Sequence, residues 1–377
     1  MKKALSLAVA LGLGLTTAAY AETTEQKMKR LEAELNALAD VVEQQQAKSG
    51  DGSSALSRTK IGGYGELHYN NTETDDGSKT KDELDFHRFV LFVSHDFNDK
   101  TRFFSELELE HSIAGDGKVG EIELEQAYIE HDITSNLQGK AGVIILPVGI
   151  MNETHEPTTF YGVERNPVEK NIVPATWWAG GVGLSGHNAT GFSYDALIHE
   201  GLNVPDSFKI RSGRQKTGKA TAKDFAATGR VKYTGVAGLE LGVTGQYQSD
   251  FAQGASHGGD ATLLETHAVY NKGKFGAKAL YARWDLDGAA AKAANKDVQD
   301  GGYIEASYKI TPKLGTFARY NVWDNGGTGD TEITQADIGV NYWLHDNVVF
   351  KADYQNQDAN DKSKASDGFN LGVGYQF

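Results

Sequence analysis

The chain of 377 residues contains no cysteine and only six prolines. Without cysteine, a disulfide framework, a thiolate-bound metal and a thiol nucleophile are all excluded. Outside residues 1–21 there is no run of about 18 apolar residues, which excludes a transmembrane helix. Positive charge is also scarce, because 37 Lys and Arg stand against 51 Asp and Glu, for a net charge of −14. Nucleic-acid binding depends on clustered cations that neutralise phosphates, so we expect no nucleic-acid partner.

Residues 1–21 have the pattern of a secretory signal peptide. Two lysines at positions 2–3 precede an apolar segment at 4–15, and small residues flank the expected cleavage site at 19–21. Removal leaves 377 − 21 = 356 residues and, with two lysines fewer, a net charge of −14 − 2 = −16. We therefore expect an acidic exported protein.

Residues 22–48 have a helical periodicity. Their apolar residues recur at alternating spacings of three and four, at Met28, Leu31, Leu35, Leu38 and Val42. Charged residues and glutamines lie between them, which is typical of the a and d positions of a coiled coil. A single amphipathic helix on a surface is the alternative. Residues 49–59 are predicted to form a flexible linker.

From residue 60 to residue 377 the pattern changes to a period of two. In QADIGVNYWL, residues 335–344, every second side chain is apolar from Ala336 to Leu344, and the other face carries Gln335, Asp337, Gly339 and Asn341. Sixteen candidate strands begin near residues 60, 84, 101, 121, 137, 180, 191, 225, 239, 261, 274, 302, 314, 334, 347 and 368.

The lengths of the connections distinguish a sandwich from a barrel, since both show this alternation. Short connections, such as 98–100, 271–274 and 311–313, alternate with long ones, such as 70–83 and 149–179. Tight turns at one rim and longer loops at the other are typical of membrane barrels. The sequence therefore predicts an all-β fold, a transmembrane antiparallel β-barrel of about sixteen strands preceded by an α-helical coiled-coil segment. Fourteen or eighteen strands are the alternatives.

Charged side chains on the polar strand faces are predicted to point inward. A charge that faces lipid at the membrane centre costs about 2–4 kcal/mol. The basic residues expected in the lumen are Arg88, Arg102, Arg230, Lys232, Arg319 and Lys351. They are opposed by the acidic residues Glu106, Glu108, Glu110, Glu121, Glu123 and Glu125. A wall that carries both signs of charge is expected.

The final strand alternates in the same way, with Leu371, Val373, Tyr375 and Phe377 on one face. This ending resembles the assembly signal of outer-membrane porins. The chain is most similar to the phosphate-selective porin O and P family and its coiled-coil-bearing relatives, through GVIILPVGIMNE (142–153), FYGVERN (160–166) and WWAGGVGLSG (177–186). Arg165 matches the family's Arg after the aromatic residue. The family's Arg before the glycine-rich strand has no counterpart in TWWAGG.

This resemblance implies a water-filled channel for passive diffusion of small hydrophilic solutes, with phosphate and dicarboxylates as candidate anions. It implies a homotrimer in the outer membrane of a Gram-negative bacterium, in contact with lipid, lipopolysaccharide and the barrel assembly machinery. Residues 22–48 would then lie in the periplasm. The 149–179 connection would be the third external loop, which narrows the pore in trimeric porins, and its charged residues are Glu153, His155, Glu156, Glu164, Arg165, Glu169 and Lys170. An ordinary external loop is the alternative.

Residues 207–223 are rich in basic residues and contain no acid: Lys209, Arg211, Arg214, Lys216, Lys219 and Lys223. An external loop of this kind attracts anions over about 8 Å at physiological salt. Contact with lipopolysaccharide phosphates is the other interpretation.

Two further functions compete with the channel. A barrel protease or lipase needs a Ser or Asp nucleophile paired with a His, and the eleven histidines are scattered. A structural link from outer membrane to cell wall would use residues 22–48. His155 lies between Glu153 and Glu156 but lacks a second nearby His, so no metal site is predicted. We expect no enzymatic activity and no cofactor.

Overall fold

The computed structural model describes residues 58–377, which form a closed barrel of sixteen antiparallel strands. Each strand pairs with its sequence neighbours, and β1 (Thr59–Thr74) pairs with β16 (Ser366–Gln376) to close the barrel. The predicted count of sixteen is confirmed. The predicted signal peptide, the coiled coil and residues 49–57 of the linker lie outside the described residues.

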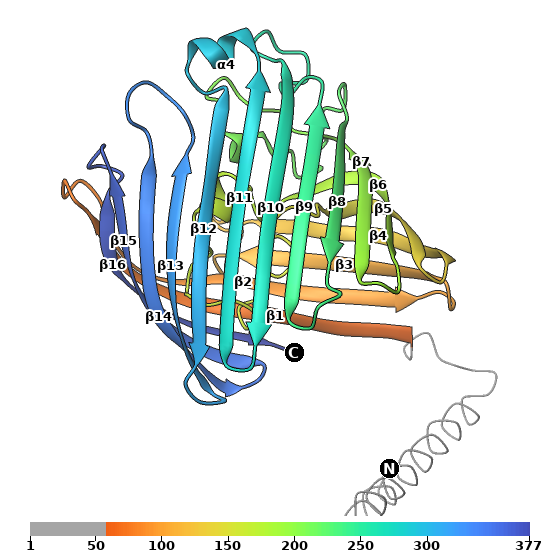
Figure 1. Cartoon of the computed structure of the whole chain (residues 1–377), viewed down its shortest axis with the longest axis horizontal. Helices are drawn as coiled ribbons and strands as arrows, with labels where there is room; N and C mark the ends of the chain where they lie inside the picture. Colours follow the sequence, from red (N-terminus) through yellow and green to blue (C-terminus); the bar gives the residue numbers. More distant parts are fainter. Residues whose placement is uncertain (1–57) are drawn as a thin grey trace, which may run out of the picture. The chain divides into compact units, whose positions relative to one another are not determined.

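The remaining strands follow in chain order around the wall (Figure 1). They are β2 (Thr80–Asp96), β3 (Thr101–Glu110), β4 (Ile122–Thr134), β5 (Leu137–Ile145), β6 (Trp178–His187), β7 (Phe192–His199), β8 (Ala226–Tyr233), β9 (Leu239–Gln248), β10 (Asp260–Lys272), β11 (Phe275–Asp287), β12 (Val298–Lys309), β13 (Leu314–Asp324), β14 (Ile333–His345) and β15 (Val348–Ala359). Short helices interrupt three connections: α3 (Val168–Asn171), η2 (Ile210–Gly213) and α4 (Ala289–Ala293).

The wall is apolar outside and polar inside. In β9, Val243 and Tyr247 are 52% and 51% exposed, whereas Thr244 and Gln248 are both 0% exposed. A soluble sandwich would bury the apolar face, so this arrangement is that of a wall surrounded by lipid. Within residues 58–377, no helix is long and apolar enough to cross a membrane.

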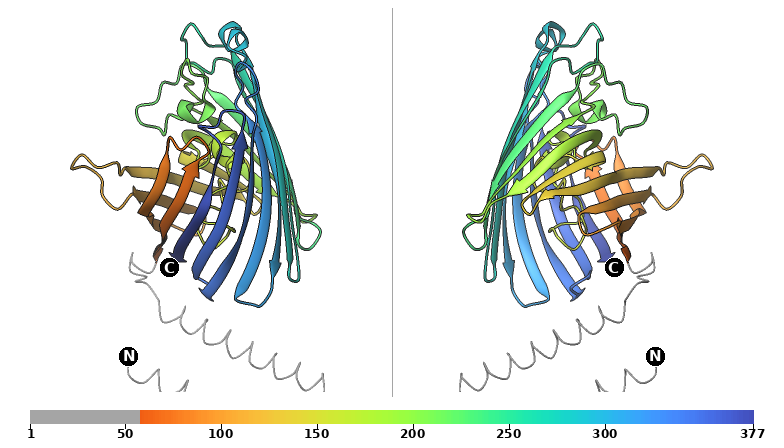
Figure 2. Two further views of the ribbon diagram at one scale, coloured as in Figure 1. Left: turned by 90° about the vertical axis from the view of Figure 1, so that its left-hand side faces the viewer. Right: turned by 90° about the vertical axis from the view of Figure 1, so that its right-hand side faces the viewer.

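The two rims differ as predicted. Figure 1 shows α4 and the longer connections at one rim, and tight turns together with the C-terminus at the other. Figure 2 shows the strands running obliquely between the rims. The first long connection, predicted at 70–83, is wrong in its bounds, because β1 continues to Thr74 and β2 begins at Thr80. Polar pairs such as Asn71 and Asp82 extend the hydrogen-bonded ladder beyond the apolar pattern from which the bounds were predicted.

An apolar cluster lies inside the barrel, where a wet pore would otherwise be expected. Trp177 and Trp284 pack with ring centroids 6.0 Å apart, and the Trp284 indole donates to the Ile172 carbonyl at 3.0 Å. The connection after β7 adds further buried residues to the cluster, including Leu202, Val204 and Ile210. This cluster fixes two inward-folded loops against one side of the wall.

Candidate functional site

The connection between β5 and β6, residues 146–177, crosses the barrel interior, and we call it the inner loop. Near its start, Thr244 of β9 donates to the Pro147 carbonyl at 3.2 Å. Further along, its contacts are with strands on the opposite wall: Thr158 donates to Gln376 at 2.8 Å, the Phe160 carbonyl accepts from Asn341 at 3.0 Å, and the Val163 amide donates to Asp353 at 2.6 Å. Because these partners belong to β14, β15 and β16, the loop spans the lumen.

Glu169 is buried and holds the inner loop in this conformation. Its carboxylate accepts the backbone N–H groups of Ile150 at 2.9 Å and Met151 at 2.6 Å, and the Tyr303 hydroxyl at 2.8 Å. Burial raises the pKa of Glu169, although these donors oppose the rise. The side chain lines neither of the two cavities described next, so we interpret it as a structural anchor.

Two cavities lie beside the inner loop, one of about 770 Å³ and one of about 390 Å³. Four residues line both, and we call them the junction: Glu164, Arg165, Lys170 and Arg211. The larger cavity is also lined by Lys81, Lys209, Lys296 and Lys364. Where the cavities meet, three cations therefore face one acid.

Glu164, the acid of the junction, has partners of its own. It accepts hydrogen bonds from Asn70 at 3.0 Å and from Nδ1 of His68 at 3.1 Å. The other ring nitrogen of His68 lies 3.1 Å from Glu66, so both nitrogens face carboxylates and the imidazole is positively charged. Burial favours the neutral acid, but the hydrogen bond and charge of His68 outweigh it and hold the pKa of Glu164 well below its usual range. The negative charge of Glu164 is thus balanced by the neighbouring His68.

The two guanidinium groups of the junction hydrogen-bond to neutral groups. Arg165 donates to the Thr176 hydroxyl at 2.6 Å, and Arg211 donates to the carbonyls of Ala175 at 2.5 Å and Lys170 at 3.4 Å. Loss of water contact, followed by the charge of Arg214, lowers the pKa of Arg211. Loss of water contact also lowers the pKa of Lys170; the charge of Glu164 opposes this, and the charge of Arg211 adds to it. An anion at the junction would relieve both effects.

The segment 207–223 is not one external basic patch, and that prediction is corrected for three of its residues. Arg211 and Arg214 turn inward, and Arg214 donates to the carbonyls of Pro174 at 3.1 Å and of Thr176. Lys216 pairs with Glu123 and lies over the Trp178 ring at 5.4 Å. The reason is that Phe208 and Ile210 pack into the apolar cluster and draw the segment into the barrel. Lys209, Lys219 and Lys223 are exposed.

The basic residues on the strands neutralise acids of the wall. Five of the six predicted lumenal cations pair with carboxylates: Arg88 with Glu66 at 2.7 Å, Arg102 with Glu130 and Asp132 at 2.5 Å, Lys232 with Glu240 at 3.6 Å, Arg319 with Glu305 at 3.2 Å and Asp337 at 3.0 Å, and Arg230 with Glu153 and Asp195. Lys351 instead lies 3.5 Å from the centre of the Phe160 ring. Most of the predicted lumenal cations are therefore neutralised by the wall, in contrast to Arg165 and Arg211 of the junction, whose described hydrogen bonds go to uncharged groups.

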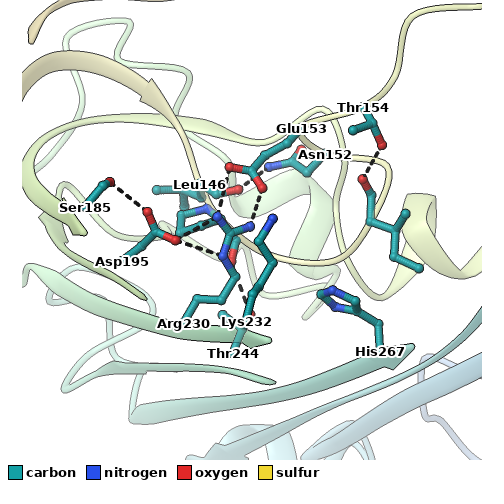
Figure 3. A network of polar contacts seen from close by, with 12 residues as sticks. Leu146, Asn152, Glu153, Thr154, Ser185, Asp195, Arg230, Lys232, Thr244 and His267 are labelled. Carbon is teal, nitrogen blue, oxygen red and sulfur yellow. Dashed lines mark hydrogen bonds and ion pairs between the residues drawn. The ribbon is translucent and has the colours of Figure 1, made fainter. Parts of the chain in front are cut away.

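Arg230 joins the inner loop to the wall. Figure 3 shows its guanidinium between Glu153 of the loop and Asp195 of β7. Asp195 lies 2.7 Å from Arg230 and also accepts from the Ser185 hydroxyl at 2.7 Å. Glu153 thus acts as a tether, while Glu156 has no described side-chain partner in residues 58–377.

A group of histidines on this wall was not predicted. His68 stacks on His87 with centroids 4.7 Å apart, and His111 lies edge-on to His87 at 5.9 Å. A β-bulge explains the arrangement: Glu66 faces Arg88, but His68 faces Asp85, so β2 has one extra residue here. The bulge turns His87 toward the same side as Arg88, which simple alternation cannot predict.

Residues 198–377 match the family model of phosphate-selective porin O and P. The predicted resemblance to outer-membrane porins is confirmed. The segments at 142–186 that carried the resemblance lie outside the matched range. An uncharacterized protein of Aquifex aeolicus (strain VF5) is 28% identical over 360 residues, which cover 84% of this chain and 79% of that relative.

Solved structures share the fold at low sequence identity. The outer membrane channel DcaP of Acinetobacter baumannii is 14% identical with a TM-score of 0.57, covering 85% of this chain and 97% of that one. OmpF of Salmonella typhi, in complex with daunomycin, is 15% identical with a TM-score of 0.58 and the same coverage of both chains. OmpT of Vibrio cholerae in a trimer form is 15% identical with a TM-score of 0.55, covering 85% and 99%. With the family match, the fold supports an outer-membrane channel located in the outer membrane of a Gram-negative bacterium.

Proposed function

We propose that the protein is a passive channel whose narrow section favours small hydrophilic anions, with phosphate and dicarboxylates as candidate solutes. The observation that carries this proposal is the junction, where Arg165, Lys170 and Arg211 line both cavities. The only acid of the junction, Glu164, is matched by His68. Rings of fixed positive charge at a constriction favour anion passage.

The four lysines of the larger cavity would raise the local anion concentration before the junction. At the junction an anion exchanges part of its water shell for the guanidinium and ammonium groups. Since these groups have lowered pKa values, they gain most from a negative neighbour. Transport by this route requires no covalent step, so the proposal includes no enzymatic activity.

The test is the reversal potential of single channels in planar bilayers across a salt gradient. The wild type should prefer anions, and Arg165→Gln, Lys170→Gln and Arg211→Gln should each lower the anion-to-cation permeability ratio. Lys219→Gln is the matched control, because Lys219 is exposed and lines neither cavity. Phosphate, sulfate and dicarboxylates are then compared as blockers. A cation-selective wild type would refute the anion proposal, and absence of conductance would refute the channel itself.

We further propose that the mature chain begins after residue 21 and assembles as a homotrimer, with residues 22–48 as a periplasmic coiled coil and a linker, predicted at 49–59, that ends where β1 begins at Thr59. The trimer form of the structurally similar OmpT supports the oligomeric state. Contact with lipopolysaccharide is assigned to Lys219 and Lys223, the exposed lysines of the basic segment that line neither cavity. The alternating face that ends at Phe377 is proposed as the signal to the assembly machinery.

A further inference from the structure

We propose that Glu106, Glu125 and His155 form a binding site for a divalent first-row transition-metal ion, with Zn²⁺ as the probe. The ion would join the inner loop, which carries His155, to β3 and β4 of the wall. None of the three ligands belongs to the junction, although Glu125 lines the smaller cavity that the junction residues also line.

The three side chains converge at a buried point. Glu106, Glu125 and His155 are 1%, 2% and 3% exposed. Nε2 of His155 lies 3.4 Å from Oε1 of Glu106 and 3.6 Å from Oε2 of Glu125. None of these three atoms has a hydrogen-bond partner within residues 58–377. Buried polar atoms are nearly always satisfied, so three unsatisfied atoms at one point require an explanation.

The tautomer of His155 adds a third hydrogen-bond acceptor to the two carboxylate oxygens. Its Nδ1 lies 3.1 Å from the Asn152 carbonyl oxygen, which can only accept, so Nδ1 carries a proton. In the neutral imidazole, Nε2 then presents a lone pair to two carboxylate oxygens. Three acceptors that face one another repel unless a positive species lies between them.

The distances favour a metal ion over a proton as that species. Zinc–ligand bonds of about 2.1 Å in tetrahedral geometry place neighbouring ligand atoms about 3.4 Å apart. The observed separations of 3.4 and 3.6 Å are close to this spacing. An N–H···O hydrogen bond to a protonated imidazole would normally be about 2.7–3.2 Å long.

The surroundings orient the ligands as an outer shell of a metal site does. The Asn152 carbonyl accepts the Nδ1 proton of His155, and Gln126 donates to the second carboxylate oxygen of Glu106 at 2.7 Å. A bulge in β4 makes this possible, because Gln126 pairs with Glu106 while Leu124 pairs with Leu107, which leaves Glu125 as the extra residue. Glu125 also lines the smaller cavity and provides an entry path.

The ligand set identifies the class of ion. One imidazole with two carboxylates suits Zn²⁺ and its first-row neighbours, whereas Mg²⁺ and Ca²⁺ prefer oxygen ligands alone. The carboxylates beside His155 in sequence do not form the site, since Glu153 pairs with Arg230. A second cluster, Asp85 with His87 and His111, is satisfied by hydrogen bonds from both imidazoles at 3.4 and 2.8 Å. This second cluster is not expected to bind the ion, and its residue His87 supplies the control variant below.

The first experiment titrates ZnCl₂ into the full-length folded barrel in detergent after chelator treatment and dialysis, by isothermal calorimetry. We expect a site whose dissociation constant rises at least tenfold in Glu125→Gln and in His155→Gln and is unchanged in His87→Asn. Mg²⁺ should not compete. Failure of the wild type to bind Zn²⁺ overturns the proposal, and so does a site that survives in the first two variants and is lost in His87→Asn.

A second measurement needs no variant and so does not depend on variant folding. X-ray absorption at the zinc edge of the loaded wild type should show one imidazole nitrogen and carboxylate oxygens at about 2.0–2.2 Å. A spectrum with two imidazoles would place the ion at another cluster and overturn the proposal. The reversal potential of the channel is measured on the chelator-treated protein without added Zn²⁺, so failure of zinc binding is distinguishable from failure of the anion channel.

Discussion

The side chain of Asn152 hydrogen-bonds to the backbone of Trp177 and holds the two ends of the inner loop together. The Asn152 oxygen accepts the Trp177 N–H at 2.6 Å, and its amide donates to the Trp177 carbonyl at 2.8 Å. The same amide donates to the Leu146 carbonyl at 2.7 Å. Asn152 thus extends the pairing of β5 and β6 to the place where the two strands separate.

Replacement of Asn152 by Ala should destabilise the protein. The change leaves the buried N–H of Trp177 without its acceptor, at a cost of about 1–3 kcal/mol per unsatisfied group. Guanidinium unfolding monitored by tryptophan fluorescence measures this. Asn136→Ala, in an exposed turn, is the control and should change the free energy of unfolding by less than about 0.5 kcal/mol. Equal losses in the two variants would contradict the assigned role.

Arg230→Met should be more disruptive than Glu153→Gln. The first change leaves both Glu153 and Asp195 without their cation, whereas the second leaves Arg230 paired with Asp195. Breaking a fully buried pair costs about 3–5 kcal/mol, and we expect less here because Glu153 is 37% exposed. The effect is measured as a change in the free energy of unfolding and in the frequency of brief closures in single-channel recordings. Arg283→Met removes an exposed pair with Asp285 and is the control, and an equally large effect there would refute the prediction.

Anion preference should fall with rising pH before an ordinary lysine titrates, at about 10.4. Loss of water contact outweighs the opposing charge of Glu164 and, with the charge of Arg211, lowers the pKa of Lys170, so this residue loses its charge at a lower pH than usual. Because the unfolded chain binds this proton more tightly, folding stability should rise across the same window. Reversal potentials between pH 7 and about 10 measure the first effect. Lys170→Met should flatten the profile, and an unaltered profile in that variant would assign the titration elsewhere.

Deletion of residues 22–57 should leave the barrel folded but lower the heat stability of the proposed trimer. Two heptads make a marginal coiled coil alone, so their contribution is expected to add to contacts between barrel walls. Light scattering and heat-modified gel mobility compare the oligomers. If the truncated protein keeps an equally heat-stable trimer, the barrel walls alone drive association.

Period-two alternation predicted the strands well, because a wall between lipid and water repeats the same requirement at every second residue. Even β6, with its many glycines, was placed within two residues of its start at Trp178. The site was less predictable. Alternation shows which face a side chain occupies but not which residue lies across the lumen, so the pairing of Glu164 with His68 was not foreseen.

β-Bulges and the paths of the loops account for the other side chains whose observed positions differ from the predicted ones. One extra residue in β2 turns His87 inward, and one in β4 turns both Glu125 and Gln126 inward, without any mark in the local pattern. Arg211 was predicted at the exterior because its segment is polar and basic. Its inward position follows from the burial of Phe208 and Ile210, two apolar residues that precede it.

Asn70 connects the first and last strands of the barrel to the inner loop. Its amide donates to Asn370 of β16 at 2.8 Å and to Glu164 at 3.0 Å. Asn70 and Asn370 are 300 positions apart, so this contact forms only when the first strand meets the last. Contacts of such long range form late in folding because the loop-closure entropy must be overcome first. The proposed selectivity would therefore be acquired only at the end of assembly, and a sheet that has not yet closed would lack it.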